Sequence, residues 1–99
     1  MRMMLKMTLH GDVANKAFRE GDLDRTMKNL TEDLKPEASY FYADNGKRTI
    51  VYFFDMKDPS QMATISEPLY LKLGAEVDYR PAMNLNDLLK GLDAAKNRY

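Results

Sequence analysis

The sequence of 99 residues contains no cysteine, no tryptophan and only one histidine, His10. Without cysteine the chain has no disulfide framework, no thiolate nucleophile and no cysteine-ligated metal. A single histidine also excludes a multi-histidine metal site within one chain, and we expect neither a metal nor a cofactor. No stretch approaches the roughly 20 apolar residues that a membrane-spanning helix needs.

An excess of one charge is also missing, because fifteen lysines and arginines balance fifteen acidic residues. With no basic excess to neutralise phosphates, nucleic acid is not the expected partner. The first ten residues, MRMMLKMTLH, alternate in polarity and do not form the apolar run of a signal peptide. Glycine-rich phosphate loops, GxSxG elbows and HExxH motifs are absent. We therefore expect a cytoplasmic protein without membrane contact.

The most informative stretch is ASYFYADNGKRTIVYFFDM, residues Ala38–Met56, which predicts a β-hairpin. Asn45-Gly46 lies between two runs of aromatic and β-branched residues, and this dipeptide suits the positive φ angles of a type I′ turn. The second strand is apolar at nearly every position from Ile50 to Phe54, so both of its faces need cover. We expect the helices of the chain on one face and a second copy of the protein on the other.

Before the hairpin, alternation over residues 2–9 predicts a first strand. A helical stretch follows, which Gly21 should divide into two pieces and Pro36 should end. Asp12 and Asp22 are the expected N-caps of the two pieces. Apolar residues at helical spacing mark the buried side of the second piece: Leu23, Met27, Leu30 and Leu34.

After the hairpin, Asp58 and Pro59 should begin a third helix, with Gln61 completing a capping box. Pro68 should kink or break this helix near Glu67, and Gly74 should end it. Residues 75–80 alternate and predict a fourth strand, placed at a sheet edge by its polar face and by Pro81. Asn84 then caps a last helix with an apolar stripe of Leu85, Leu88, Leu89 and Leu92, followed by a frayed tail over residues 93–99.

The predicted order is β, broken α, β, β, α, β and an added C-terminal helix, in one domain over residues 1–99. Two βαβ units with right-handed crossovers give the ferredoxin-like α+β fold, a four-stranded antiparallel sheet with helices on one face. Strand order 4-1-3-2 puts the first and third strands at the centre, which suits the apolar third strand.

The segment PEASYFYADNGKRTIVYFFDMKDPSQMATISEPLYLKLGAEVDYRPAMNLNDL, residues 36–88, resembles small uncharacterised bacterial proteins of the dimeric α+β barrel class. The resemblance implies a homodimer in which two ferredoxin-like sheets pack face to face. The class includes cofactor-free monooxygenases, muconolactone isomerases and haem-handling enzymes. Their catalytic residues find no match in this chain, so the resemblance concerns the fold and the dimer.

An apolar ligand pocket is one interpretation of the six aromatic residues of the hairpin, Tyr40, Phe41, Tyr42, Tyr52, Phe53 and Phe54. Tyr40, Tyr42 and Tyr52 are the candidate ligand-binding residues, because each adds a hydroxyl to an apolar ring. Cross-strand aromatic pairs that build a core or a dimer surface explain the same residues without a ligand.

The candidate catalytic residues are His10 as a general base, Tyr52, and Arg80 as a clamp for a carboxylate. Charged residues of opposite sign on the first and fourth strands also suit an ordinary stabilising ladder, with Lys6 and His10 on the first strand and Glu76, Asp78 and Arg80 on the fourth. The leading hypothesis is a homodimer that binds a small hydrophobic ligand or has a structural role. The alternative is a cofactor-free enzyme, similar to a monooxygenase or isomerase, acting on a small hydrophobic or aromatic metabolite. A third hypothesis is an interaction module that docks through the leucine stripe of the last helix.

Overall fold

The computed structural model describes all residues 1–99 and contains one antiparallel sheet of four strands in the order β2-β3-β1-β4. The strands are β1 (Arg2–Leu9), β2 (Ala38–Asp44), β3 (Lys47–Asp55) and β4 (Glu76–Pro81). This order is the predicted 4-1-3-2 read from the other edge. The ferredoxin-like prediction is therefore confirmed, with β1 and β3 central and β4 at an edge.

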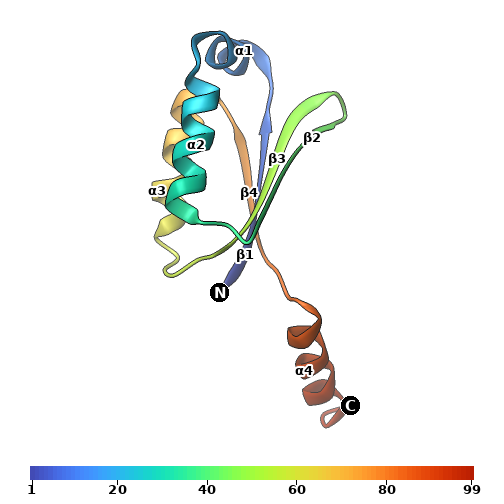
Figure 1. Cartoon of the computed structure of the whole chain (residues 1–99). Coiled ribbons are helices and arrows are strands. Elements are labelled where there is room, and N and C mark those ends of the chain that lie inside the picture. Colours follow the sequence, from blue (N-terminus) through green and yellow to red (C-terminus); the bar gives the residue numbers. More distant parts are fainter.

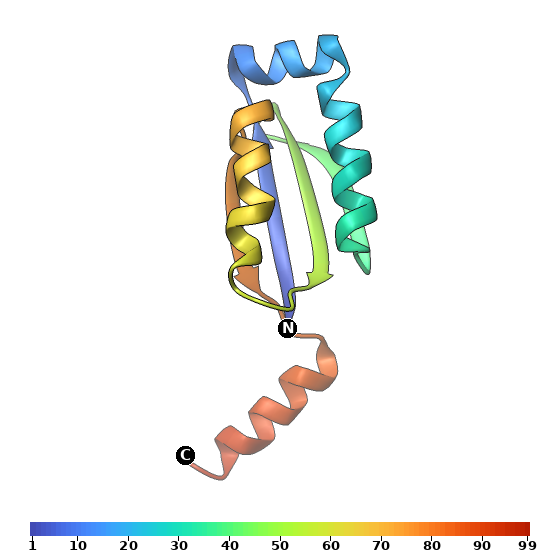
Figure 2. The same cartoon turned by 90° about the vertical axis from the view of Figure 1, so that its left-hand side faces the viewer.

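Three helices cover one face of the sheet: α1 (Gly11–Glu20), α2 (Asp22–Leu34) and α3 (Gln61–Leu73). α2 and α3 run along the strands and α1 crosses one end of the sheet (Figure 2). The alternation of β1 turns Met3, Leu5, Met7 and Leu9 toward these helices, where each is at most 2% exposed. The core lies between this face and the helices, and it includes Ile50, Tyr52 and Phe54 of β3 and Leu69 and Leu73 of α3.

Local chemistry sets the hairpin turn and most helix ends. Asn45 and Gly46 have φ angles of 52° and 76°, as a type I′ turn requires. Gly21, at φ 80°, separates α1 from α2, and Gly74 ends α3 in the left-handed region. Asp58 accepts hydrogen bonds from the backbone and side chain of Ser60 in the turn that leads into α3.

Three expectations about helices are wrong. α3 begins at Gln61 with Ser60 at its N-cap and no side-chain cap, so Asp58 and Pro59 lie before the helix. Gln61 accepts hydrogen bonds from the backbone amides of Lys57 and Asp58. α1 begins at Gly11 with His10 at its N-cap, and α2 begins directly after Gly21. Asp12 and Asp22 therefore lie inside first turns, where a carboxylate interacts favourably with the helix dipole. α3 also continues without a break through Pro68. This residue is exposed at the groove between α2 and α3, where water can solvate the carbonyl that lost its amide partner.

The opposite face of the sheet carries no helix (Figure 1), and we call it the open face. Strand pairing arranges its side chains in rows that run from β2 to β4. Two of these rows are Ala38–Phe53–Met4–Arg80 and Tyr40–Val51–Lys6–Asp78, and a third is Tyr42–Thr49–Thr8–Glu76. The half of the open face on β2 and β3 is thus mainly apolar, and the half on β4 is charged.

The last helix, α4 (Leu85–Lys96), projects away from the domain beyond the end of the sheet (Figure 1). Asn84 is the N-cap as predicted, and with Asp87 it forms a capping box; the helix also extends into the region where fraying was expected. No residue of α4 is buried, and its four leucines are 40–67% exposed. The radius of gyration is 16.0 Å, whereas a compact chain of this length has about 13 Å.

Candidate functional site

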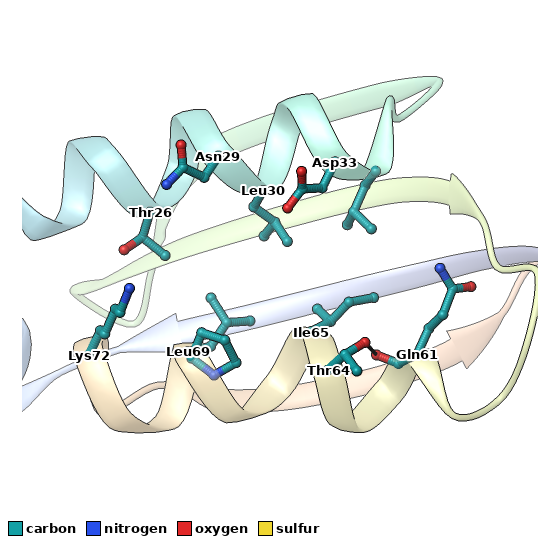
Figure 3. A pocket seen from close by; sticks show the side chains of 11 residues that line it. Thr26, Asn29, Leu30, Asp33, Gln61, Thr64, Ile65, Leu69 and Lys72 are labelled. Carbon is teal, nitrogen blue, oxygen red and sulfur yellow. Dashed lines mark hydrogen bonds between the residues drawn. The ribbon is translucent and has the colours of Figure 1, made fainter.

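Three hollows adjoin α2, one of them a shallow depression lined by Met27, Lys28, Thr31, Glu32 and Phe41. The first is a groove of about 350 Å³ between α2 and α3 (Figure 3). Polar side chains form its rim, with Thr26, Asn29 and Asp33 on α2 facing Gln61, Thr64 and Lys72 on α3. Its apolar floor is already covered by the packing of the domain, because Leu30 and Ile65 are 8% exposed and Leu69 is 1% exposed. A ligand would therefore bury little additional apolar surface there.

The second hollow, of about 340 Å³, lies between α2 and the β2–β3 hairpin, and we call it the hairpin hollow. The hairpin diverges from α2 toward its turn (Figure 1), so the helix layer does not close over it. Most of the lining is apolar and comes from α2, the end of β1 and the two hairpin strands: Leu9, Leu23, Met27, Phe41, Tyr42, Ala43 and Ile50. This composition is typical of a site for a small apolar molecule.

Phe41 is the most unusual residue of the hairpin hollow. It pairs with Ile50 across β2 and β3, so its side chain belongs to the helix-facing side of the sheet, yet it is 60% exposed. The ring forms a T-shaped pair with Tyr52, with ring centroids 6.4 Å apart and planes at 90°. A large aromatic ring on the core side of a sheet normally adds to the core, and here the ring borders open space.

Tyr52 is the buried residue that contacts Phe41 at the hairpin hollow. Its ring is fully buried, and its hydroxyl lies 2.7 Å from Thr31 Oγ1 and 3.4 Å from the carbonyl oxygen of Met27. Burial raises the pKa of Tyr52, while the hydrogen bond with Thr31 acts in the opposite direction. The phenol is therefore held neutral and oriented by α2, which makes it a structural support for the residues around it.

Two cations, Lys47 and Arg48, complete the lining of the hairpin hollow. The Arg48 guanidinium donates a hydrogen bond of 3.0 Å to Asn15 Oδ1. It also lies 5.5 Å from the centre of the Phe18 ring, in a cation–π arrangement. α1 therefore positions the side chain of Arg48 through two neutral groups.

The three tyrosines predicted to bind a ligand divide between the two faces of the sheet. Tyr52 faces the helices, whereas Tyr40 and Tyr42 pair with Val51 and Thr49 and belong to the open face, where they are 63% and 45% exposed. Tyr42 also adjoins the hairpin hollow. A two-residue turn determines the register of a hairpin, so counting back from Asn45-Gly46 would have separated these tyrosines.

The three predicted catalytic residues do not converge within one chain. His10 lies at the end of β1, where its Nε2 is 3.0 Å from Glu76 Oε1. Arg80 pairs with Met4 on the open face, about 20 Å along the strands from His10 at roughly 3.3 Å per residue. Tyr52 lies on the opposite side of the sheet.

The predicted charge ladder is present with different partners. Lys6 stands opposite Asp78 in the sheet, but its Nζ donates a 3.0 Å hydrogen bond to Asp44 on the other side. Arg80 instead binds Asp78 at 3.0 Å. The Asp44 carboxylate raises the pKa of Lys6, chiefly by this hydrogen bond. These exposed pairs are modest stabilisers of the sheet.

No three histidine or acidic side chains gather in the way a metal site requires. No helix has the length and apolar character needed to cross a bilayer.

No protein-family model matches the chain, and no curated protein matches it. Among solved structures the chain is similar to the "De novo designed protein Ferredog-Diesel", with a TM-score of 0.55 and 11% sequence identity. The match covers 82% of this chain and 85% of the designed one. At this identity the similarity concerns the fold alone, and it agrees with the ferredoxin-like topology described above.

Proposed function

We propose that this protein is a homodimeric binding protein for a small hydrophobic molecule, and that the hairpin hollow holds the ligand. The observation that carries the proposal is the exposed ring of Phe41 on the core side of the sheet. Leu23 and Met27 of α2, both partly buried, face the same hollow. A ligand between α2 and Phe41 would complete the apolar layer that the diverging hairpin leaves open.

Binding is tested with the neutral fluorescent probe N-phenyl-1-naphthylamine, whose emission rises in apolar surroundings. We expect saturable binding to the wild-type chain and at least a tenfold loss of affinity in Phe41→Ser. Leu71→Ser is the matched control, because Leu71 is a 78% exposed apolar residue on α3 outside the hollow. Equal affinities of the two variants for the probe would overturn the assignment of the hollow.

The dimer is proposed to form through the open face, which corresponds to the dimeric α+β barrel arrangement. Phe53, Val51 and Met4 are only partly buried within one chain, and Tyr40 is largely exposed beside them. A second open face would cover these side chains. Where β1 pairs with β4 on this face, two acidic groups, Glu76 and Asp78, balance two basic groups, Lys6 and Arg80, so two copies can approach without net repulsion.

α4 adjoins the same interface. Arg2 pairs with Asp55 in the sheet, and its guanidinium reaches Asp87 in the first turn of α4 at 3.0 Å. The first turn of α4 therefore adjoins the open face. We propose that a second copy bound to that face also contacts the leucine stripe of α4. An isolated helix of 12 residues is marginal in water, so burial of this stripe would stabilise α4 as well as the dimer.

Sedimentation equilibrium at micromolar concentrations is the test of the dimer. We expect a mass twice the 11.4 kDa of the chain, reduced to the monomer value in Phe53→Glu. Replacing Leu88 and Leu89 together with glutamine should weaken the dimer without lowering monomer stability, because neither leucine is buried. A wild-type chain that sediments as a monomer would overturn the proposal.

A further inference from the structure

The charge of Arg48 is not compensated by any acidic group. The two other arginines of the sheet each bind carboxylates, Arg2 with Glu37 and Asp87, and Arg80 with Asp78. Arg48 has no carboxylate within 4 Å, and its partners are the neutral Asn15 amide and the Phe18 ring. Positioning by neutral groups leaves the guanidinium charge available to a ligand.

The charges near Arg48 also leave this hollow with an excess of positive charge. Lys47 lines the same hollow and forms no ion pair in the chain. Asp44 is the acidic residue nearest in the hairpin, where it stands opposite Lys47, but it accepts a hydrogen bond from Lys6 on the open face. The mouth of the hairpin hollow therefore carries two cations, and no carboxylate is among its lining residues.

Strand pairing places Arg48 beside the apolar part of the hollow. Arg48 is opposite Ala43 in β2 and Leu9 in β1, one pair further along the helix-facing side than Phe41 and Ile50. The apolar wall and Arg48 thus lie side by side on one face of the sheet, and the guanidinium extends from there toward Asn15 and Phe18 of α1. A molecule resting on Phe41 would have one end next to Arg48.

We propose that the ligand is a small monocarboxylic acid, with its apolar body against Phe41, Leu23 and Met27 and its carboxylate held by Arg48. The planar guanidinium matches a carboxylate in two parallel hydrogen bonds, and Lys47 adds a second positive charge. A hollow of about 340 Å³ lies at the small end of ligand sites. This inference rests on the proposed binding function and adds the chemical class of the ligand.

The test compares three ligands of one shape, 4-phenylbutyrate, 4-phenylbutanol and 4-phenylbutylamine, by competition with N-phenyl-1-naphthylamine. In the wild-type chain we expect the acid to displace the probe at least tenfold more effectively than the alcohol, and the amine to be weakest. Arg48→Gln should abolish the advantage of the acid and leave the alcohol unchanged. Arg48→Lys should retain part of the advantage, because it keeps the charge and loses the planar geometry.

Lys72→Gln is the matched control, because Lys72 is also a cation without an ion-pair partner but lies in the groove between α2 and α3. It should leave the preference for the acid intact. If the alcohol binds wild-type protein as well as the acid does, the carboxylate proposal fails while the binding function stands. If Lys72→Gln removes the preference and Arg48→Gln does not, the assignment to Arg48 fails. If neither the probe nor any of the three ligands binds, both proposals fail.

Discussion

The opposite surroundings of Phe53 and Phe54 lead to a quantitative prediction about β3. Phe54 is 2% exposed, faces the helices and stands opposite Met3. Replacing a buried phenylalanine with alanine costs about 3–5 kcal/mol, a large part of the roughly 5–15 kcal/mol that stabilises a typical domain. Phe53 lies on the open face and is only partly buried, so Phe53→Ala should cost the monomer about 1 kcal/mol.

Urea unfolding over a range of protein concentrations separates these effects. The wild-type midpoint should rise with concentration, because a dimer stabilises the folded chain by mass action. Phe54→Ala should lower the midpoint at every concentration and keep this dependence. Phe53→Ala should remove most of the dependence while changing the low-concentration midpoint little. If both variants lose the same free energy of unfolding under monomeric conditions, the assignment of Phe53 and Phe54 to opposite faces is refuted. If the midpoint of Phe53→Ala depends on concentration as strongly as that of the wild type, the proposed interface is refuted.

Two further predictions concern other positions. Tyr52→Phe removes the hydroxyl that bonds with Thr31 and should cost about 1 kcal/mol at neutral pH. Burial raises the pKa of Tyr52 in the folded chain. The neutral phenol therefore contributes its full stabilisation below the pKa that tyrosine has in the unfolded chain, about 10, and this contribution is lost as the pH rises through the pKa in the folded chain. Thermal unfolding followed between pH 8 and 12 should therefore show that the melting temperature of Tyr52→Phe falls less steeply with rising pH than that of the wild-type chain. Melting temperatures that fall in parallel would contradict this prediction. Gly74→Ala should cost more than Gly21→Ala, since both have positive φ but only at Gly74 would a Cβ meet a neighbour, Val13, at 3.1 Å. The neighbouring atom is the Cβ of Val13, so adding Val13→Gly to each variant should narrow the difference in denaturant midpoint, and an unchanged difference would exclude the contact as its cause.

Features controlled by a few adjacent residues could be predicted from the sequence. The Asn45-Gly46 turn, the division of the helix at Gly21, the left-handed end at Gly74 and the N-cap at Asn84 all appear as expected. Each depends on φ angles or hydrogen bonds within one turn of chain, so residue type is sufficient. The strand order followed from the same local pattern together with the handedness of βαβ crossovers.

The hairpin register was also determined by the sequence, through its two-residue turn. Asp44 stands opposite Lys47, which places Tyr40 beside Val51 and on the other face from Tyr52. The same parity assigns Phe53 and Phe54 to opposite faces. Which face the helices cover could not be read from β3 alone, because consecutive apolar residues from Ile50 to Phe54 leave no alternation to interpret.

Only the tertiary structure decided where the candidate site lies. Arg48 is about thirty residues from Asn15 and Phe18 along the chain, and nothing in the local sequence joins them; α1 brings them together by crossing the end of the sheet. The exposure of Phe41 likewise depends on how far the hairpin diverges from α2, a property of packing between distant elements. Residue type and spacing describe each element, whereas the space left between elements follows from how all of them pack at once.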